Sequence, residues 1–190
     1  MGWYRRFGKR AVDVVGASAA LVLLAPLLAA TAVLIKLEDR GPVLFRQTRV
    51  GRGGDPFPFL KFRSMAIGTP NLASADARGL RVTRVGRWIR RTNIDELPQL
   101  VNVLRGEMSL VGPRPALPSQ TALVELRSRG GALDCLPGLT GLAQVSAYDG
   151  MPETEKAAFD GEYARTVSLR RDAGIVLRTF RYLTQPPPVY

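Results

Sequence analysis

The stretch VVGASAALVLLAPLLAATAVLI, residues 14–35, contains 22 consecutive positions without a charged side chain. As a straight α-helix it would be about 33 Å long, which is enough to cross the hydrocarbon core of a bilayer. Pro26 lies near its middle and removes one backbone hydrogen bond, so a helix here should bend. The stretch therefore predicts a membrane protein whose fold begins with a bent apolar helix.

Basic residues lie on both sides of this stretch: Arg5, Arg6, Lys9 and Arg10 before it, and Lys36, Arg40, Arg46, Arg49 and Arg52 after it. A spanning helix usually carries its positive charge at the cytoplasmic end. Positive charge at both ends favours a re-entrant helix that breaks at Ala25 and Pro26 and returns to the same face. An ordinary spanning helix and a cleaved signal peptide are the alternatives. We expect Asp13, at the membrane entrance, to pair with Lys9 or Arg10, and take Arg10 and Asp13 as the entrance pair.

The net charge of +11 is unevenly distributed along the 190 residues. Residues 1–110 hold 18 basic and 8 acidic side chains, whereas the remaining residues hold 9 and 8. The first part should attract anions, whether nucleic acid, lipid headgroups or phosphorylated small molecules. Most of the basic residues are arginine, which suits phosphate binding, although biased codon usage is an equal explanation.

Two scarce residue types limit the chemistry. The sequence has no histidine, which excludes imidazole bases and histidine-ligated zinc. Its single cysteine, Cys135, excludes an internal disulfide and suggests a reducing compartment. Acid–base or nucleophilic chemistry therefore falls mainly to carboxylates.

Local patterns predict the elements that follow. Residues 44–46 and 57–62 read as strands around a glycine-rich turn at 51–54, which favours a plain hairpin over a phosphate loop. Residues 84–91 form an amphipathic helix with an arginine face, suited equally to the membrane interface or to the core surface. Further expectations are a loop at 71–80, a tight turn at 137–141, two helices within 153–183 and an extended tail at 185–190. In the two C-terminal helices, the expected apolar faces are Ala157, Ala158, Phe159 and Tyr163, and Ile175, Val176, Leu177, Phe180 and Leu183.

An acidic pair precedes a short predicted helix. Leu97, Leu100, Val101 and Leu104 repeat at helical spacing, and the helix should end at Gly106. Pro98 is tolerated only in a first turn, which places Asp95 and Glu96 at the helix N-terminus. By itself this pair is better explained as a helix cap and a dipole partner than as a catalytic pair.

Nearby cations favour a chemical role for the pair. Arg114 lies between two prolines that stiffen its backbone. Lys61 and Arg63 point to one face of a predicted strand, where they suit phosphate contact, lipid headgroups or structural pairing equally. Carboxylates, fixed arginines and a membrane segment together suggest phosphoryl chemistry at a bilayer surface.

At this point the sequence resembles the bacterial sugar transferases, the small monotopic phosphoglycosyl transferases. The resemblance covers residues 9–182 and rests on motifs in order. They are Lys9, Arg10 and Asp13; GPVLF at 41–45 with Gln47 and Arg49; KFRSM at 61–65; DELPQL at 95–100 with Asn102 and Val103; GEMSLVGPRP at 106–115; and PGLTG at 137–141 with Gln144 and Val145.

The resemblance implies a mostly helical α/β monotopic membrane protein. Its parts would be a re-entrant helix-break-helix in residues 1–36, a compact catalytic body with interfacial amphipathic helices in 37–183, and a proline-rich tail in 184–190. The body would lie on the cytoplasmic face of the bacterial inner membrane, against an anionic bilayer, with no nucleic acid partner. The oligomeric state is left open.

The resemblance also implies a reaction. Family members transfer a sugar 1-phosphate from a UDP-sugar to undecaprenyl phosphate, release UMP and need Mg²⁺. Asp95 would be the nucleophile that forms an aspartyl-phosphosugar intermediate, and Glu96 a Mg²⁺ ligand or orienting group. Arg114 would bind the diphosphate, with Lys61 and Arg63 as further candidates.

Two departures from the family pattern stand out. The break is Ala25-Pro26 instead of Ser-Pro. Alanine cannot return a hydrogen bond to the freed backbone, so we expect the bend to differ in angle or depth. Residues 146–149 read SAYD where an arginine is common, so that substrate contact is not carried over, and Tyr148 is a stacking candidate. The rival functions are a nucleic-acid-binding protein, which leaves the apolar run unexplained, and a basic membrane anchor, which leaves the acidic pair unexplained.

Overall fold

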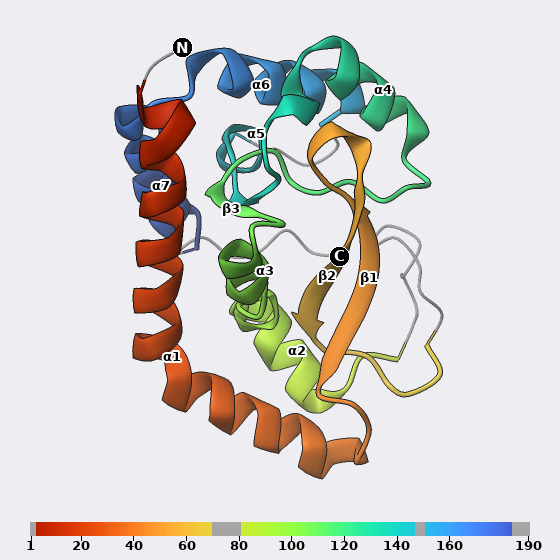
Figure 1. Ribbon diagram of the computed structural model, residues 1–190. Coiled ribbons are helices and arrows are strands. Elements are labelled where there is room, and N and C mark those ends of the chain that lie inside the picture. The colour runs from red at the N-terminus through yellow and green to blue at the C-terminus, as the bar shows by residue number, and fades with distance from the viewer. Residues whose placement is uncertain (1–2, 70–80, 147–150, 184–190) are drawn as a thin grey trace.

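The computed structural model describes residues 3–69, 81–146 and 151–183 (Figure 1). The expected mostly helical α/β architecture is confirmed, with two small sheets among the helices. The helices are α1 (Lys9–Asp39), α2 (Arg84–Arg91), α3 (Gln99–Arg105), α4 (Thr121–Arg129), α5 (Leu142–Val145), α6 (Glu153–Thr166) and α7 (Leu169–Leu183). The strands are β1 (Leu44–Val50), β2 (Pro56–Phe62), β3 (Ser109–Val111) and β4 (Gly138–Thr140).

Helix α1 follows one side of the molecule and then turns beneath it, as two limbs that meet at a bend (Figure 1). Pro26 lies inside this helix and explains the bend, because it has no N–H for the helical ladder. The expected break at Ala25 and Pro26 is instead a bend within one continuous helix. The helix also runs past the expected boundary at residue 36 and ends at Asp39.

Most of the apolar surface of α1 faces away from the rest of the protein. Val22 and Leu23 are 75% and 79% exposed, whereas Ala17 and Ile35 are buried against the body. Among the described residues, Tyr4–Asp39 is the segment whose length and composition would allow it to cross a membrane. The narrow buried stripe holds α1 to the body, and the wide exposed face suits a lipid environment.

Strands β1 and β2 form the expected hairpin, with Leu44 opposite Phe62 and Val50 opposite Pro56. The turn uses Gly53 at φ 69°, a conformation that favours glycine. Strand β1 continues four residues beyond the predicted 44–46. One hairpin face supplies Phe57 and Phe59 to a core shared with α1 and α3.

Helices α2 and α3 form as expected. Ile89 on α2 is fully buried, while Trp88 beside it is 45% exposed and the arginines lie outside, so one face of α2 packs on the core. Helix α3 ends at Gly106, whose φ of 84° is the left-handed cap conformation.

The prediction of a tight turn at 137–141 is wrong. Gly138–Thr140 forms β4, which pairs in parallel with β3. A Cβ on Gly138 would lie 2.1 Å from the Gly112 nitrogen, so glycine is needed here for close approach of two backbones. Pairing between segments so far apart in the sequence leaves no local signal.

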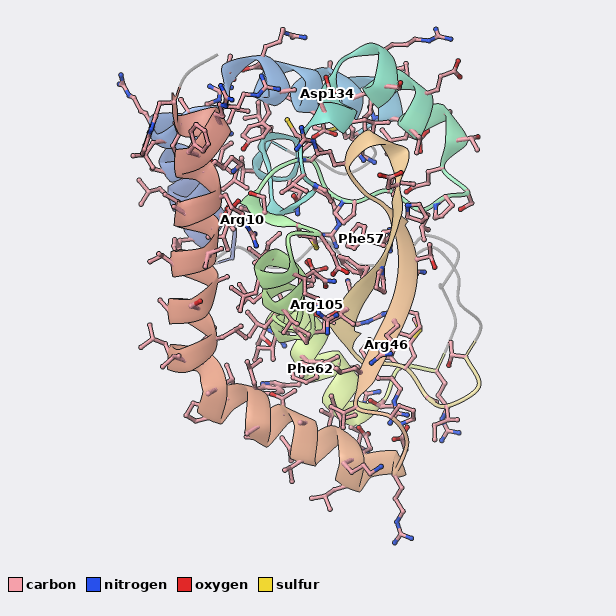
Figure 2. All side chains as sticks on the ribbon, viewed as in Figure 1. Arg10, Arg46, Phe57, Phe62, Arg105 and Asp134 are labelled. Atoms are coloured by element: carbon pink, nitrogen blue, oxygen red, sulfur yellow. The ribbon has the colours of Figure 1, made fainter. Side chains whose placement is uncertain are left out.

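The prediction of an Arg10–Asp13 entrance pair is also wrong. Asp13 is buried and accepts hydrogen bonds from Ser109 Oγ and the Leu110 N–H, each 3.0 Å long. Arg10 points from α1 toward the body (Figure 2) and donates to the carbonyls of Val103 and Leu104 at 2.6 and 2.8 Å. Each side chain satisfies a tertiary partner, and Lys9 likewise pairs with Asp172 at 2.8 Å.

The two predicted C-terminal helices are confirmed as α6 and α7. Tyr163 and Ile175 are buried as expected, but Leu177 and Phe180 on α7 are exposed, so the expected apolar face of α7 is only partly buried. The predicted loop at 71–80, Tyr148 and the tail at 185–190 lie outside the described residues.

Candidate active site

The acidic pair lies in a short 3₁₀ turn, Ile94–Glu96, immediately before α3. Asn93 opens this turn in the left-handed conformation with φ 55°, and Pro98 precedes the first residue of α3. Asp95 is only 7% exposed and Glu96 is partly buried. The pair therefore lies in a separate turn just before α3, and not in the first turn of the helix itself.

Lys61 and Arg114 converge on Glu96 from different elements. Lys61 Nζ, on β2, lies 2.7 Å from Glu96 Oε1 and 3.8 Å from Asp95 Oδ2. Arg114, in the loop after β3, donates two hydrogen bonds to Glu96, of 3.1 Å to Oε2 and 2.5 Å to Oε1. Four of the predicted site residues are thus brought together.

Arg63 is not brought to this cluster. Its guanidinium pairs with Asp39 at the end of α1, and it lies against Gly41, where a Cβ would collide with the guanidinium. Of the three roles that the sequence left open for Arg63, the structure provides structural pairing. It fastens the end of the apolar helix to the hairpin.

The surroundings shift the pKa values of the two carboxylates in opposite directions. Burial raises the pKa of Asp95, and the positive charge of Lys61 opposes that rise only in part. Burial would also raise the pKa of Glu96, but the charges and hydrogen bonds of Arg114 and Lys61 outweigh it and hold that pKa well below its usual range. The surroundings of Glu96 therefore favour its charged form strongly, whereas burial makes the charged form of Asp95 less favourable than usual.

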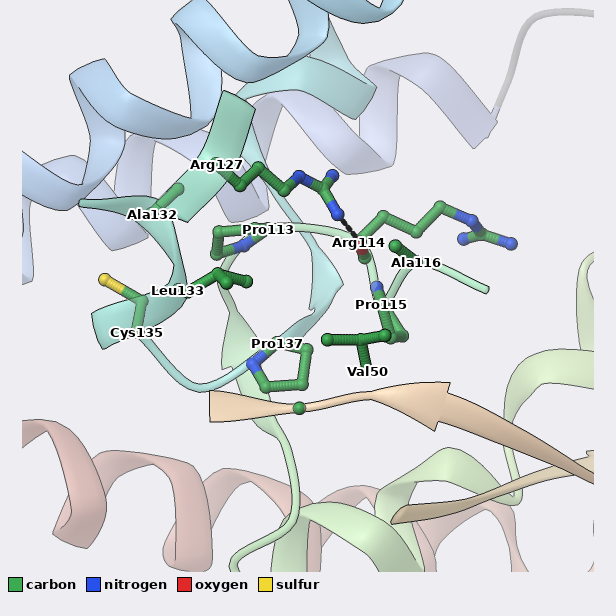
Figure 3. Close-up of a pocket in the computed structure, with 11 residues that line it drawn as sticks. Val50, Pro113, Arg114, Pro115, Ala116, Arg127, Ala132, Leu133, Cys135 and Pro137 are labelled. Carbon is green, nitrogen blue, oxygen red and sulfur yellow. Dashed lines mark hydrogen bonds between the residues drawn. The ribbon is translucent and has the colours of Figure 1, made fainter. Parts of the chain in front are cut away.

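Arginine side chains hold the loop that carries Arg114. Arg49 Nη1, on β1, donates to the Pro115 carbonyl at 3.2 Å, and Arg127 Nη1, on α4, donates to the Arg114 carbonyl at 2.8 Å (Figure 3). Burial, together with the nearby charge of Arg114, lowers the pKa of Arg49 to about 10. Both arginines hold the backbone of this loop through these carbonyl groups.

From the sequence, Arg49 is recognised only as a basic residue after the apolar stretch and as part of a family motif, and Arg127 is not recognised at all. Gln47 and Arg49 lie on the same hairpin face as Lys61, because Phe45 is opposite Lys61 and alternate residues share a face. Extending the predicted strand past residue 46 would have placed Arg49 on the same face as Lys61. Arg127 has no such local signal, since it reaches the site from α4.

Comparison with known proteins identifies the family. A family model described as bacterial sugar transferase matches residues 4–186. The chain belongs to the bacterial sugar transferase family. This transferase is 50% identical over 180 residues to UDP-glucose:undecaprenyl-phosphate glucose-1-phosphate transferase of Caulobacter vibrioides, covering 90% of the chain and 67% of the relative.

Two other relatives are considerably longer than the chain. The UDP-glucose:undecaprenyl-phosphate glucose-1-phosphate transferase of Escherichia coli is 41% identical over 183 residues, covering 92% of the chain and 39% of the relative. A UDP-N-acetylgalactosamine-undecaprenyl-phosphate N-acetylgalactosaminephosphotransferase of Aeromonas hydrophila is 43% identical over 185 residues, covering 92% and 43%. The names of these similar proteins include two different sugars, so similarity at this level does not identify the donor sugar.

The carboxylate pair of this sugar transferase is compatible with Mg²⁺. Within the described ranges, no cluster of three or more acidic, cysteine or histidine side chains forms a complete metal cage. Mg²⁺ commonly needs only one or two protein carboxylates, and substrate phosphates and waters complete its shell. Glu96 fits as such a ligand through Oε2, which accepts the longer of the two Arg114 hydrogen bonds and retains a lone pair.

Proposed function

We propose that this sugar transferase moves a sugar 1-phosphate from a UDP-sugar to undecaprenyl phosphate. The observation that carries the proposal is the buried Asp95 carboxylate, set beside a charged Glu96 that holds Lys61 and Arg114. A nucleophile that is poorly solvated and flanked by cations suits attack on a phosphate anion. The printed names of the similar proteins include both substrates.

The first step is attack by an Asp95 oxygen on the β-phosphorus of the donor. A bond forms between that oxygen and the phosphorus, the bond to the bridging oxygen breaks, and UMP leaves with the electron pair. The sugar phosphate is then joined to Asp95 as a mixed anhydride. In the second step an oxygen of the lipid phosphate attacks the same phosphorus, and the Asp95 carboxylate leaves. The acceptor is already an anion, so no base is required.

Lys61 and Arg114 provide positive charge where the diphosphate must lie. Lys61 Nζ is within 3.8 Å of the Asp95 carboxylate, and the Arg114 fork suits two phosphate oxygens. Glu96 keeps both cations at the site when no substrate is bound. Mg²⁺ held by Glu96 would neutralise charge on the departing phosphate. Arg63 is not included, because its partner is Asp39.

The membrane arrangement follows from α1. Its exposed apolar face, including Val22, Leu23 and Leu37, would lie in lipid, where the undecaprenyl chain of the acceptor also resides. We place the catalytic body on the cytoplasmic face of the bacterial inner membrane, with α1 entering and leaving one leaflet around Pro26. The basic flanks would face anionic headgroups.

A donor-only exchange experiment tests the proposed chemistry. Detergent-solubilised protein with Mg²⁺, a panel of UDP-sugars and labelled UMP, but without lipid, should move label into the UDP-sugar, because the covalent step is reversible. Asp95→Asn should abolish this exchange, while Asp134→Asn, at an exposed position on another turn, should leave it unchanged.

The results separate the two parts of the proposal. Turnover only when lipid is present, with no exchange in its absence, would contradict the covalent intermediate while retaining the transferase. Full exchange by Asp95→Asn would refute Asp95 as the nucleophile. If wild-type protein releases no UMP with any donor and acceptor together, the proposed function is wrong.

A further inference from the structure

The loop between β3 and α4 is held at consecutive carbonyl groups by unrelated parts of the chain. The Pro113 carbonyl accepts from the Gly138 N–H at 2.8 Å, and the Ala116 carbonyl from the Val50 N–H at 2.9 Å. Between them, the carbonyls of Arg114 and Pro115 accept from arginine side chains. A loop fixed in this way carries its side chains at defined positions, although it has no regular secondary structure.

The donor to the Arg114 carbonyl is itself held in a buried ion pair. Arg127 Nε and Nη2 lie 2.8 and 2.6 Å from Asp160 Oδ2 on α6. The side chains of Arg127 and Asp160 are only 6% and 1% exposed. The remaining guanidinium nitrogen, Nη1, reaches the Arg114 carbonyl at 2.8 Å. A chain of contacts therefore runs from α6 through α4 to the backbone of a site residue.

Figure 3 shows the last contact of this chain, from Arg127 to Arg114. Arg127 approaches the Arg114 carbonyl from one side, and the Arg114 side chain extends the other way. The Arg114 side chain is 42% exposed and donates to both Glu96 oxygens, a two-point contact that depends on where this long side chain starts. The location of its backbone therefore largely determines whether the guanidinium can reach both Glu96 oxygens at once.

A buried ion pair between two helices carries a large desolvation penalty. Replacing such a pair by apolar side chains of similar size is often neutral or stabilising, so burial alone does not explain Arg127 and Asp160. Among side chains, only a guanidinium has N–H groups on three nitrogens of one rigid plane, so that it can donate to a carboxylate and a carbonyl together. This geometry suits a positioning role for the pair.

We propose that Arg127 and Asp160 form a positioning pair that holds Arg114 in register with Glu96 for the donor half of the reaction. The inference rests on the proposed function and deepens it. Neither residue touches the reacting atoms, and both act through the backbone of Arg114. Small displacements of a positioning group far from the chemistry can reduce rate on the order of 100-fold.

The test is a double-mutant cycle measured by donor-only UMP exchange. Arg127→Met should lower the exchange kcat by roughly tenfold to a hundredfold, and Arg114→Met should lower it at least as much. The double variant should be no slower than Arg114→Met alone, because Arg127 acts through that side chain. Losses that multiply in the double variant would overturn the proposal.

Two further variants keep the result interpretable. Asp160→Asn preserves shape and should give a smaller loss with the same lack of additivity, which covers the case that Arg127→Met does not fold. Arg129→Met, on the same helix in an exposed pair with Glu125, should retain wild-type exchange. Equal losses in Arg129→Met and Arg127→Met would also overturn the proposal.

Thermal unfolding of the same proteins supplies a readout that does not need turnover. Positioning predicts non-additive stability changes for substitutions at residues 127 and 114, because Arg127 bonds the carbonyl of the residue whose side chain bonds Glu96. If wild-type protein shows no transfer, the proposed function fails, and this stability cycle still decides whether the two residues are coupled. Strict additivity there would refute the pair's action on Arg114.

Discussion

At the level of single residues, adjacent carboxylates acquire different properties because their neighbours differ. Glu96 is bonded to Lys61 and Arg114, whereas Asp95 has Lys61 at 3.8 Å and little exposure to water. The more strongly paired carboxylate keeps its charge and holds the cations. The less strongly paired one, Asp95, is the carboxylate that we propose as the nucleophile, with Glu96 as its support.

The raised pKa of Asp95 predicts a shifted acid limb in the pH–rate profile. Attack needs the ionised form, so kcat/KM for UMP release should fall as pH decreases through the Asp95 pKa, at a higher pH than for an ordinary aspartate. Lys61 opposes the rise, so Lys61→Met should move the limb to still higher pH. Arg129→Met, which removes a distant positive charge, should leave the limb where it is. A downward shift in Lys61→Met would contradict this account.

Close backbone approach behind the Arg114 loop makes Gly112 sensitive to substitution. A Cβ there would lie 2.3 Å from the Leu136 carbonyl oxygen, which is backbone and cannot move aside cheaply. We expect Gly112→Ala to lower the free energy of unfolding by roughly 1–3 kcal/mol. Gly174→Ala, in the middle of α7 with nothing near its Cβ, should raise it by about 0.5–1 kcal/mol. Thermal unfolding in detergent distinguishes these outcomes, and equal changes would refute the explanation.

At the level of elements, the sequence predicts the helices and strands that form through local patterns, and it does not predict those that depend on contacts between distant segments. The hairpin, α2, α3 and the two C-terminal helices depend on local periodicity and glycine or proline signals, and each occurs where predicted, although β1 is four residues longer than predicted. Strand β4 forms by pairing with β3, and the partner of Asp13 is Ser109 in β3. Both contacts join distant parts of the sequence, so local patterns predicted a turn for β4 and the wrong partner for Asp13. At the site, motif resemblance selected Asp95, Glu96 and Arg114. Arg127 is held through contacts that no sequence spacing encodes.

The bend in α1 leads to a prediction about membrane topology. If the helix enters and leaves one leaflet, its two flanks lie on the same side. In a Cys135→Ala background, Arg6→Cys and Thr48→Cys, both at exposed positions, should react with an impermeant maleimide in inside-out inner-membrane vesicles and not in right-side-out ones. Labelling from opposite sides would show that α1 spans the bilayer.

The same labelling tests the part played by Pro26. Pro26→Ala restores a helical N–H and removes the clash that bends the helix, so a straighter α1 is long enough to span. We expect a larger share of Arg6→Cys chains to react from the periplasmic side in this variant. Ser18→Ala, a substitution in the same helix that leaves the backbone hydrogen bonds intact, should not change that share.

At the level of the whole molecule, one buried carboxylate joins the start of the chain to its end. Asp172 on α7 accepts from the Tyr4 hydroxyl at 2.6 Å, from Lys9 Nζ at 2.8 Å and from the Tyr163 hydroxyl at 2.8 Å. Burial of the Tyr163 phenol, together with the negative charge of Asp172, raises the pKa of that phenol, which therefore stays a donor. The apolar helix is thus fixed near its N-terminal end by Asp172 and near its C-terminal end by the Arg63–Asp39 pair.

This closure predicts that Asp172→Asn destabilises the protein although it lies outside the proposed site. The substitution leaves a mostly buried Lys9 without its counter-charge, and loss of one partner of such a pair should lower the free energy of unfolding by roughly 2–4 kcal/mol. Glu125→Gln, in an exposed pair with Arg129, should have little effect, since surface pairs contribute little. Below its unfolding temperature, Asp172→Asn should keep a near-normal KM for the donor, because neither Lys61 nor Arg114 depends on it. A raised donor KM with unchanged stability would mean that Asp172 acts at the site and not as a fastener for α1.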